Sequence, residues 1–340
     1  MIVVFCFICS SITYKQVNAN SYSRSEIVME KLSGRIIHET NAYEKLPIAS
    51  TTKIITAITV IENFDVNKTV VIPYECVGIE GSSIYLRENE EYTVLDLLYG
   101  LMLRSGNDCA ETLATTLTKN KSEFIKLMNE TAKKCGAINS NFTNPHGLHD
   151  ENHYSTAYDL AKITCFALQN QTFKQIVSTK RHTAMELSSQ TKKVWVNKNK
   201  LLNDFLGATG VKTGFTKKAG RCLVSSAEKN GMEIITVVLD CPMMFERSEE
   251  LLNSSFNNYK LVKIIDKDKF NYTLPDKNGN YHQLKITSSF YYPLKNDEKL
   301  NAKLNLPKRL SNKVKSGEIV GKIEIYGLKQ LIFSQNIYTL

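Results

Sequence analysis

Beyond its first twelve residues, the sequence has no apolar run long enough to span a bilayer. Its later cysteines show neither Cys-x-x-Cys spacing nor the pattern of a zinc site. The net charge of +9 favours an anionic partner, such as nucleic acid, a membrane surface or an acidic polymer. Because neither an Arg-rich cluster nor basic–aromatic interleaving accompanies this charge, nucleic acid is the weakest of the three. We therefore expect no nucleic-acid partner, no metal and no organic cofactor, and we keep peripheral membrane contact open.

The first residues resemble a secretory signal. Residues 2–12 form a short apolar block, and Val17-Asn18-Ala19 resembles a small-residue cleavage site. No Lys or Arg precedes the block, and a buried N-terminal strand is the alternative. We expect residues 1–19 to be a signal peptide and the protein to be exported to the extracytoplasmic face of the envelope. Disulfides among the six later cysteines are then possible, but sequence does not determine their pairing.

The chain is long enough for two domains. It has 340 residues, of which 42% are hydrophobic and 23% charged, as in soluble globular proteins. Helical patterns and strand-like runs alternate up to about Asn258. After it, short β-like runs at residues 284–286, 289–292, 318–326 and 330–333 alternate with Lys, Asn and Asp. We expect a mixed α/β domain over residues 24–258 and a small all-β domain over residues 259–340.

Ser50-Thr51-Thr52-Lys53 precedes the apolar stretch 54–61. Apolar residues cover most of the circumference of the predicted helix, which is therefore buried, with Ser50 as its N-cap or first-turn residue. Lys53 lies one turn after Ser50 on the same face. Burial lowers the pKa of a lysine, so Lys53 can accept the proton of Ser50 and make it a nucleophile. The pattern alone is weak, since Ser189/Lys192 and Ser226/Lys229 repeat it and an ordinary buried helix would also fit.

A second polar group falls between two predicted apolar helices. The first helix covers residues 93–103 with Thr93 as its N-cap, and the second begins at Cys109. Ser105-Gly106-Asn107 lies on the tight connection between them, where a hydroxyl and a carboxamide can face a cleft. A plain helix–helix turn would contain the same residue types.

A third group lies on the first of three strand-like runs, at residues 207–215, 219–227 and 232–239. Together with a predicted hairpin at residues 26–38, these runs indicate an antiparallel sheet. Lys212-Thr213-Gly214 offers a cation, a hydroxyl and bare backbone against which a substrate can lie.

Three histidines occur in residues 144–153, at positions 146, 149 and 153. Their spacing resembles a metal-ligating set, but Pro145, Gly147 and an Asp-Glu-Asn run predict a loop. We interpret them as supporting or surface histidines rather than ligands.

The ordered set Ser50-x-x-Lys53, Ser105-Gly106-Asn107 and Lys212-Thr213-Gly214 resembles the three motifs of penicillin-binding proteins and serine β-lactamases. The surrounding segments 47–56, 80–86, 97–108, 144–148, 154–161 and 211–220 are similar to low-molecular-weight D-alanyl-D-alanine carboxypeptidases. The resemblance covers roughly residues 26–335. It implies a β-lactamase/transpeptidase-like catalytic domain over residues 24–258, with an antiparallel sheet flanked by helices, and a C-terminal β domain.

The resemblance implies a role for each matching residue. Ser50 would form an acyl-enzyme with a peptidoglycan pentapeptide, and Lys53 would act as the base. Ser105 and Asn107 would pass a proton to the leaving D-alanine and hold the substrate amide. The implied substrate-binding residues are Lys212, Thr213, Gly214, Phe215 and Arg247, with the backbone N–H groups of Ser50 and Phe215 forming the oxyanion hole. β-Lactams would be covalent inhibitors.

The sequence departs from the family at two places. Phe215 stands where relatives often have His or Tyr, and no amphipathic membrane helix is apparent after the β domain.

Two alternative functions remain. A class A β-lactamase needs a deacylating Glu before the Lys212 strand, whereas the only similar run, Glu249 to Asn253, follows that strand. An envelope-binding protein without turnover would keep the same motifs.

Overall fold

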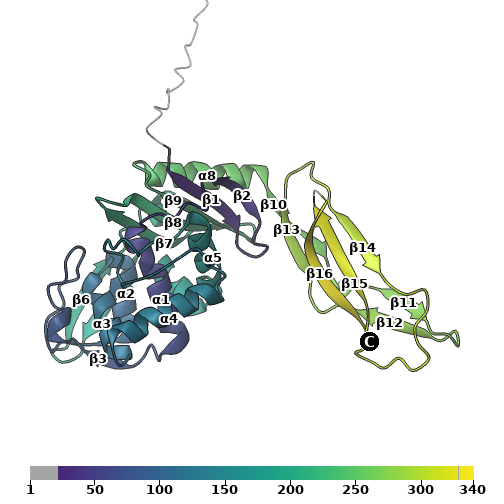
Figure 1. Ribbon diagram of the computed structural model, residues 1–340, viewed down its shortest axis with the longest axis horizontal. Helices are drawn as coiled ribbons and strands as arrows, with labels where there is room; N and C mark the ends of the chain where they lie inside the picture. The colour runs from purple at the N-terminus through teal and green to yellow at the C-terminus, as the bar shows by residue number, and fades with distance from the viewer. Residues whose placement is uncertain (1–21, 328) are drawn as a thin grey trace, which may run out of the picture.

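The computed structural model describes residues 22–327 and 329–340. The predicted signal peptide, residues 1–19, lies outside the described residues. A helix-rich region holds the first part of the chain, and the C-terminal strands extend away from it (Figure 1). None of the helices in the described ranges is long and apolar enough to cross a membrane. The six described cysteines are buried, and none of them forms a disulfide.

A five-stranded antiparallel sheet forms the centre of the helix-rich region, in the order β2-β1-β9-β8-β7. Its strands are β1 (Ser25–Glu30), β2 (Ile36–Thr40), β7 (Ala208–Thr216), β8 (Gly220–Lys229) and β9 (Met232–Leu239). The predicted hairpin and the three predicted strands are thereby confirmed. Two small antiparallel pairs accompany the sheet: β3 (Thr69–Val71) with β4 (Glu91–Thr93), and β5 (Arg181–Glu186) with β6 (Thr191–Val196).

Helices cover both faces of this sheet. Those in contact with it are α1 (Lys53–Asn63), α5 (Ala157–Ala167), α6 (Gln171–Ser178), α7 (Leu201–Asp204) and α8 (Met244–Asn258). The helices α2 (Val94–Tyr99), α3 (Asn107–Leu117) and α4 (Lys121–Lys134) pack against other helices of this region. Alternate residues of a strand point to opposite faces. Accordingly, Ile235 and Val237 of β9 join the core around α1 and α5, whereas Ile234 and Val238 pack with Leu252 of α8. The predicted antiparallel sheet flanked by helices is confirmed.

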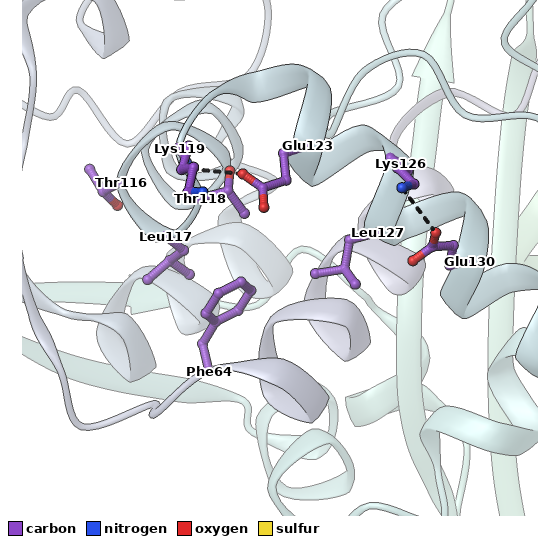
Figure 2. Close-up of a pocket in the computed structure, with 9 residues that line it drawn as sticks. All are labelled: Phe64, Thr116, Leu117, Thr118, Lys119, Glu123, Lys126, Leu127 and Glu130. Atoms are coloured by element: carbon purple, nitrogen blue, oxygen red, sulfur yellow. Dashed lines mark hydrogen bonds and ion pairs between the residues drawn. The ribbon is translucent and has the colours of Figure 1, made fainter.

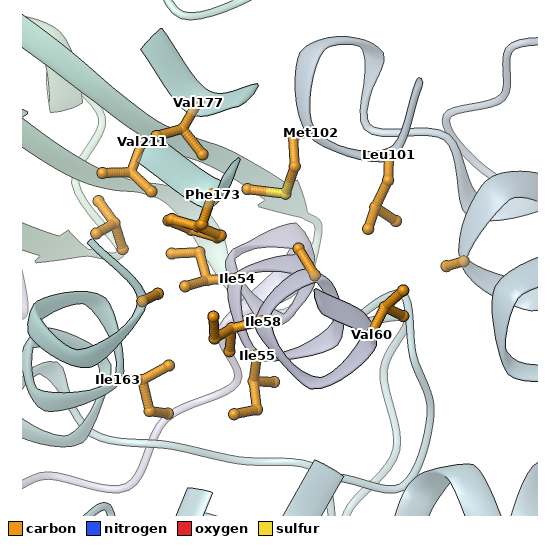
Figure 3. Close-up of a cluster of buried hydrophobic side chains, with 14 of the residues drawn as sticks. Ile54, Ile55, Ile58, Val60, Leu101, Met102, Ile163, Phe173, Val177 and Val211 are labelled. Atoms are coloured by element: carbon orange, nitrogen blue, oxygen red, sulfur yellow. The ribbon is translucent and has the colours of Figure 1, made fainter. Parts of the chain in front are cut away.

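Helix α1 is buried along most of its length, as its apolar pattern predicts. Figure 3 shows Ile54, Ile55 and Ile58 of this helix surrounded by side chains from other elements, including Phe173 of α6 and Val211 of β7. A helix packed on all sides gives its first turn a fixed position. The tightly packed helix therefore also fixes the position of the residues just before α1.

The helix predicted over residues 93–103 is divided in two. Thr93 is the N-cap, as predicted, and its hydroxyl accepts a hydrogen bond from the Asp96 backbone. After Tyr99 the chain changes to a π-helical turn, η4 (Gly100–Arg104). A Cβ on Gly100 would lie 2.8 Å from Cys109 Sγ, so glycine permits the close approach of α3 at this point. Such π-helical turns are frequent at functional sites.

The C-terminal region is all β, as predicted. Strands β10 (Lys260–Ile265) and β13 (Phe290–Leu294) form one pair. A five-stranded sheet has the order β11-β12-β16-β15-β14, with bounds β11 (Tyr272–Pro275), β12 (Tyr281–Lys285), β14 (Asn301–Asn305), β15 (Ile319–Gly327) and β16 (Gln330–Thr339). The sequence interpretation missed β10, β11 and β14, since these strands are short and largely polar or exposed.

The two regions meet at Arg35, in the turn between β1 and β2. Its guanidinium donates to both carboxylate oxygens of Glu298, each at 2.8 Å, and to the carbonyl of Pro293. It also lies over the rings of Tyr259 and Tyr292, at 5.1 and 4.9 Å. One side chain therefore joins the sheet of the helix-rich region to the C-terminal strands.

Candidate active site

Ser50 lies in a short 3-10 turn, η2 (Ala49–Thr52), immediately before α1. It is a first-turn residue rather than an N-cap, since the caps are Ile48 for η2 and Thr52 for α1. The neighbouring hydroxyls are used within the turn: Thr51 donates to the Ile48 carbonyl and Thr52 to the Ala49 carbonyl. Ser50 is half-buried, so its hydroxyl remains accessible for chemistry.

Lys53 is fully buried at the start of α1, and its Nζ lies 3.0 Å from Ser50 Oγ. The same Nζ is 2.7 Å from Asn107 Oδ1 and 2.7 Å from the carbonyl oxygen of His146. Burial, followed by the charge of nearby Lys212, lowers the pKa of Lys53 well below its usual value.

These three contacts match the valences of a neutral amine. The Asn107 amide orientation follows from its other end, because Nδ2 donates to the Glu80 carbonyl at 2.5 Å. Both Asn107 Oδ1 and the His146 carbonyl are acceptors, so they take the two hydrogens of an NH₂ group. The lone pair of Lys53 then faces Ser50, and the serine O–H can donate to it. Ser50 and Lys53 are thus arranged as the predicted nucleophile–base pair requires.

Ser105 and Asn107 flank the glycine between η4 and α3. Ser105 has a positive φ of 65° and is 5% exposed, and its hydroxyl has no hydrogen-bond partner among the described residues. Asn107 is held by its backbone N–H, which donates to the Ser82 carbonyl at 2.7 Å. The next residue, Asp108, accepts from the Ser83 hydroxyl and from the backbone of Ile84 and Leu86. The loop at residues 80–86 therefore supports the second motif through its backbone.

Strand β7 brings the third motif against the η2 turn. A Cβ on Gly214 would lie 3.1 Å from the backbone nitrogen of Ser50, so this position requires glycine for the approach. Lys212 is buried and its Nζ donates to the Thr213 carbonyl at 2.9 Å. Burial, with a smaller contribution from Lys198, lowers the pKa of Lys212 to about 7. Thr213 is half-buried, whereas Phe215 is 62% exposed beside it.

Arg247 does not join this group. It lies on α8, where its guanidinium donates to Glu26 from Nε at 3.0 Å and from Nη2 at 2.6 Å. A third bond goes to Glu250. A role in binding a substrate carboxylate stays a prediction, and it would require Arg247 to exchange Glu26 for the substrate.

Two of the three loop histidines lie beside the η2 turn. His153 Nε2 is 2.8 Å from the hydroxyl of Thr52, and His146 supplies the carbonyl that contacts Lys53. His149 is exposed, and it pairs with Glu151 at the surface. No sequence pattern predicts the two backbone acceptors, at Glu80 and His146, because any residue type can supply a carbonyl.

A hollow of about 530 Å³ lies elsewhere, between the end of α3 and α4. Figure 2 shows Phe64, Leu117 and Leu127 at its apolar side, with Lys126 paired to Glu130 at its edge. Its lining includes none of the residues singled out from the sequence. The motif residues, rather than this hollow, therefore remain the candidate active site.

Comparisons with known proteins agree with the geometry. The family model described as D-alanyl-D-alanine carboxypeptidase matches residues 12–243. A second model, described as penicillin-binding protein 5, C-terminal domain, matches residues 259–340.

Alignments with individual relatives cover most of the chain. It is 32% identical over 276 residues to the D-alanyl-D-alanine carboxypeptidase DacF of Bacillus subtilis, covering 78% of this chain and 70% of the relative. With DacC of Escherichia coli, also named D-alanyl-D-alanine carboxypeptidase, the identity is 30% over 89% of this chain and 79% of the relative. The solved structure of penicillin-binding protein 5 from Haemophilus influenzae matches with a TM-score of 0.80, at 28% identity over 94% of this chain and 96% of that one.

Proposed function

Because the chain belongs to the D-alanyl-D-alanine carboxypeptidase family of serine peptidases, we propose that it releases the terminal D-alanine of peptidoglycan stem peptides through an acyl-enzyme on Ser50. The observation that carries the proposal is the arrangement around Lys53. Its Nζ has two acceptors at 2.7 Å and the Ser50 hydroxyl at 3.0 Å, in a buried position that disfavours the ammonium. This arrangement supports Lys53 as a general base.

In the first half-reaction, Ser50 Oγ attacks the carbonyl carbon between the two D-alanines, and its proton goes to Lys53 Nζ. The C–N bond then breaks, and the Ser105 hydroxyl relays this proton to the amine of the leaving D-alanine. An ester between Ser50 and the shortened peptide remains. In the second half-reaction, a water molecule attacks the ester with Lys53 again as the base. The shortened peptide leaves, and Ser50 regains its proton.

The surrounding groups bind the substrate and its developing charge. Lys212 and Thr213 hold the terminal carboxylate, and Asn107 holds the substrate amide. The backbone N–H groups of Ser50 and Phe215 receive the oxyanion, a contact worth about 10²–10³ in rate per donor. The close approach of Gly214 to the Ser50 nitrogen supports this last assignment.

The same serine would form a long-lived ester with penicillin. Rapid hydrolysis of such an ester requires an additional base, as in class A β-lactamases. The nearest sequence match to that base, Glu249, lies on α8 and therefore follows the β7 strand. We accordingly propose inhibition by penicillin rather than its destruction.

Export to the envelope and a boundary between two domains at residues 258/259 also belong to this proposal. Both are supported by the kinship with penicillin-binding protein 5, whose C-terminal model begins its match at residue 259. Peripheral contact with a membrane stays open.

The decisive experiment is D-alanine release from diacetyl-Lys-D-Ala-D-Ala by the purified protein. We expect release by the wild type and none by Ser50→Ala, together with stable labelling of the wild type by fluorescent penicillin. Labelling without D-alanine release would favour an envelope-binding protein. Rapid nitrocefin hydrolysis would favour a β-lactamase.

A further inference from the structure

The Lys53 environment depends on a loop for which the catalytic steps above have no role. The three-histidine loop, residues 144–153, supplies the His146 carbonyl at 2.7 Å from Lys53 Nζ. The loop is seated closely on the η2 turn, since a Cβ on Gly147 would lie 1.9 Å from the Ala49 carbonyl oxygen. Thr56 of α1 adds a hydrogen bond to the Pro145 carbonyl at 2.7 Å.

The imidazole of His146 is fixed on both of its nitrogens. Nδ1 accepts a hydrogen bond from the Leu148 backbone at 3.1 Å, so in the neutral ring the hydrogen is on Nε2. Nε2 lies 2.8 Å from Glu111 Oε1 and donates to it. The side chains of His146 and Glu111 are each only 9% exposed, so water competes little for this bond.

Glu111 is itself held in place by an ion pair with Lys121, which lies nearer the surface. It lies on α3, four residues after Asn107, and its Oε1 accepts from Lys121 Nζ at 2.7 Å. Burial alone would raise the pKa of Glu111, but the bonds from His146 and Lys121 lower it, so the carboxylate is charged at neutral pH. Helix α3 therefore supports both acceptors of Lys53: Asn107 directly, and the His146 carbonyl through Glu111.

We propose that His146 is a positioning residue for Lys53 and that the Glu111–His146 hydrogen bond keeps the His146 carbonyl in place to accept one hydrogen of the Lys53 amine. The lone pair of Lys53 is then directed at Ser50. This inference rests on the proposed function, and it concerns the steps in which Lys53 is the base, of which the acylation of Ser50 can be measured by itself. The three histidines thus have different roles: His146 orients the base, His153 contacts Thr52 in the turn, and His149 pairs at the surface.

The test compares Glu111→Leu, which removes the acceptor, with Glu111→Gln, whose amide oxygen can still accept from His146. Rates of Ser50 acylation by fluorescent penicillin and kcat and KM for diacetyl-Lys-D-Ala-D-Ala are measured for both. Glu111→Leu should lower acylation and kcat by about 10- to 100-fold with little change in KM, the size expected for a misplaced base. Glu111→Gln should restore most of the rate. Glu151→Leu, which removes the exposed partner of His149 in the same loop, is the matched control and should be neutral.

Two variants of His146 cover the case in which Glu111→Leu folds poorly, since His146→Gln should keep most of the acylation rate and His146→Ala should lose it. His146→Gln can still donate to Glu111, whereas His146→Ala cannot. Where Glu111→Leu folds, combining it with His146→Ala completes a double-mutant cycle. On the His146→Ala background, Glu111→Leu should have no further effect on acylation. Folded Glu111→Leu acylated at the wild-type rate, or additive effects in the cycle, would overturn the proposal. A wild type that is acylated but releases no D-alanine contradicts the proposed function alone, and a wild type that is not acylated contradicts both.

Discussion

The helix-rich region and the C-terminal β domain differ most in how they use charge. Residues 259–340 contain 15 Lys and Arg against 7 Asp and Glu, a net charge of +8. Residues 1–258 contain 28 and 27, a net charge of +1. All 15 cationic residues of the β domain are exposed, whereas Lys53 and Lys212 in the helix-rich region are at most 2% exposed.

This contrast shows that environment decides what a lysine does. In water an ammonium is stable, and the exposed lysines contribute charge to the surface. Within the core, burial lowers the pKa of both Lys53 and Lys212, to about 7 for Lys212, and so favours the uncharged amine at both positions. Most of the net charge of the chain therefore comes from its β domain, and the net charge does not indicate what the buried lysines of the candidate active site do.

The sharpest test of the contrast replaces one lysine from each region by methionine, which keeps the length and removes the amine. Lys53→Met should lower Ser50 acylation by about 10²–10⁴-fold, the usual contribution of a general base. Lys322→Met, on the exposed side of β15, should leave acylation unchanged. The rate of labelling by fluorescent penicillin measures both. If Lys53→Met keeps a tenth or more of the rate, the base lies elsewhere.

The second prediction concerns how much the burial of Lys212 lowers the free energy of unfolding. The pKa of Lys212 falls from 10.5 to about 7 on folding, so the unfolded chain binds more protons between these values. Stability should therefore rise with pH across this window and be lowest, for this group, below pH 7. Lys212→Met should raise the free energy of unfolding at pH 6 by about 2 kcal/mol and flatten its rise between pH 7 and 10. Thermal unfolding at several pH values measures this, and an unchanged slope would contradict it.

How far the sequence predicts this molecule depends on whether side chains carry the signal. The apolar pattern of α1, the cap at Thr93 and the strands β7 to β9 were predictable, since each is a local pattern of side-chain types. The order of the three motifs predicted that Ser50, Lys53 and Asn107 meet. The carbonyls of Glu80 and His146 were not predictable from side chains, since a backbone acceptor has no residue signature.

The C-terminal domain was predicted in type but only partly in detail. Strands β15 and β16 have enough alternating apolar residues to be recognised, whereas β14 (NAKLN) contains little apolar surface. Its position depends on pairing with β15, which is a tertiary contact. The contacts of Arg35 with Glu298, 263 positions further along the chain, and with two tyrosines are also tertiary contacts, which no local pattern predicts.

The third prediction concerns Arg35, whose replacement removes a contact between the helix-rich region and the C-terminal strands. Because its pair with Glu298 is bidentate and both side chains are less than one-fifth exposed, Arg35→Ala should lower the free energy of unfolding by about 1.5 kcal/mol. It should also increase proteolytic cleavage near residue 259. Acylation of Ser50 should remain within twofold of the wild type, since Arg35 contacts none of the site residues. Arg24→Ala, which removes an exposed pair with Glu44 inside one region, is the control. A parallel loss of acylation would show that the β domain supports the site.

The smallest expected effect comes from Lys198, an exposed lysine whose backbone N–H donates to the Leu103 carbonyl beside η4. After burial, its charge is the second cause of the lowered pKa of Lys212. If the Lys212 ammonium binds the substrate carboxylate, kcat/KM should decline as pH rises through about 7, where the free enzyme loses that proton. Lys198→Met removes a like charge and should move this decline to higher pH by less than about one unit. Lys192→Met, an exposed lysine on β6, should leave the profile unchanged. A profile that does not move with Lys198 would mean that burial alone sets the alkaline limb, so that surface charge has no influence on the site.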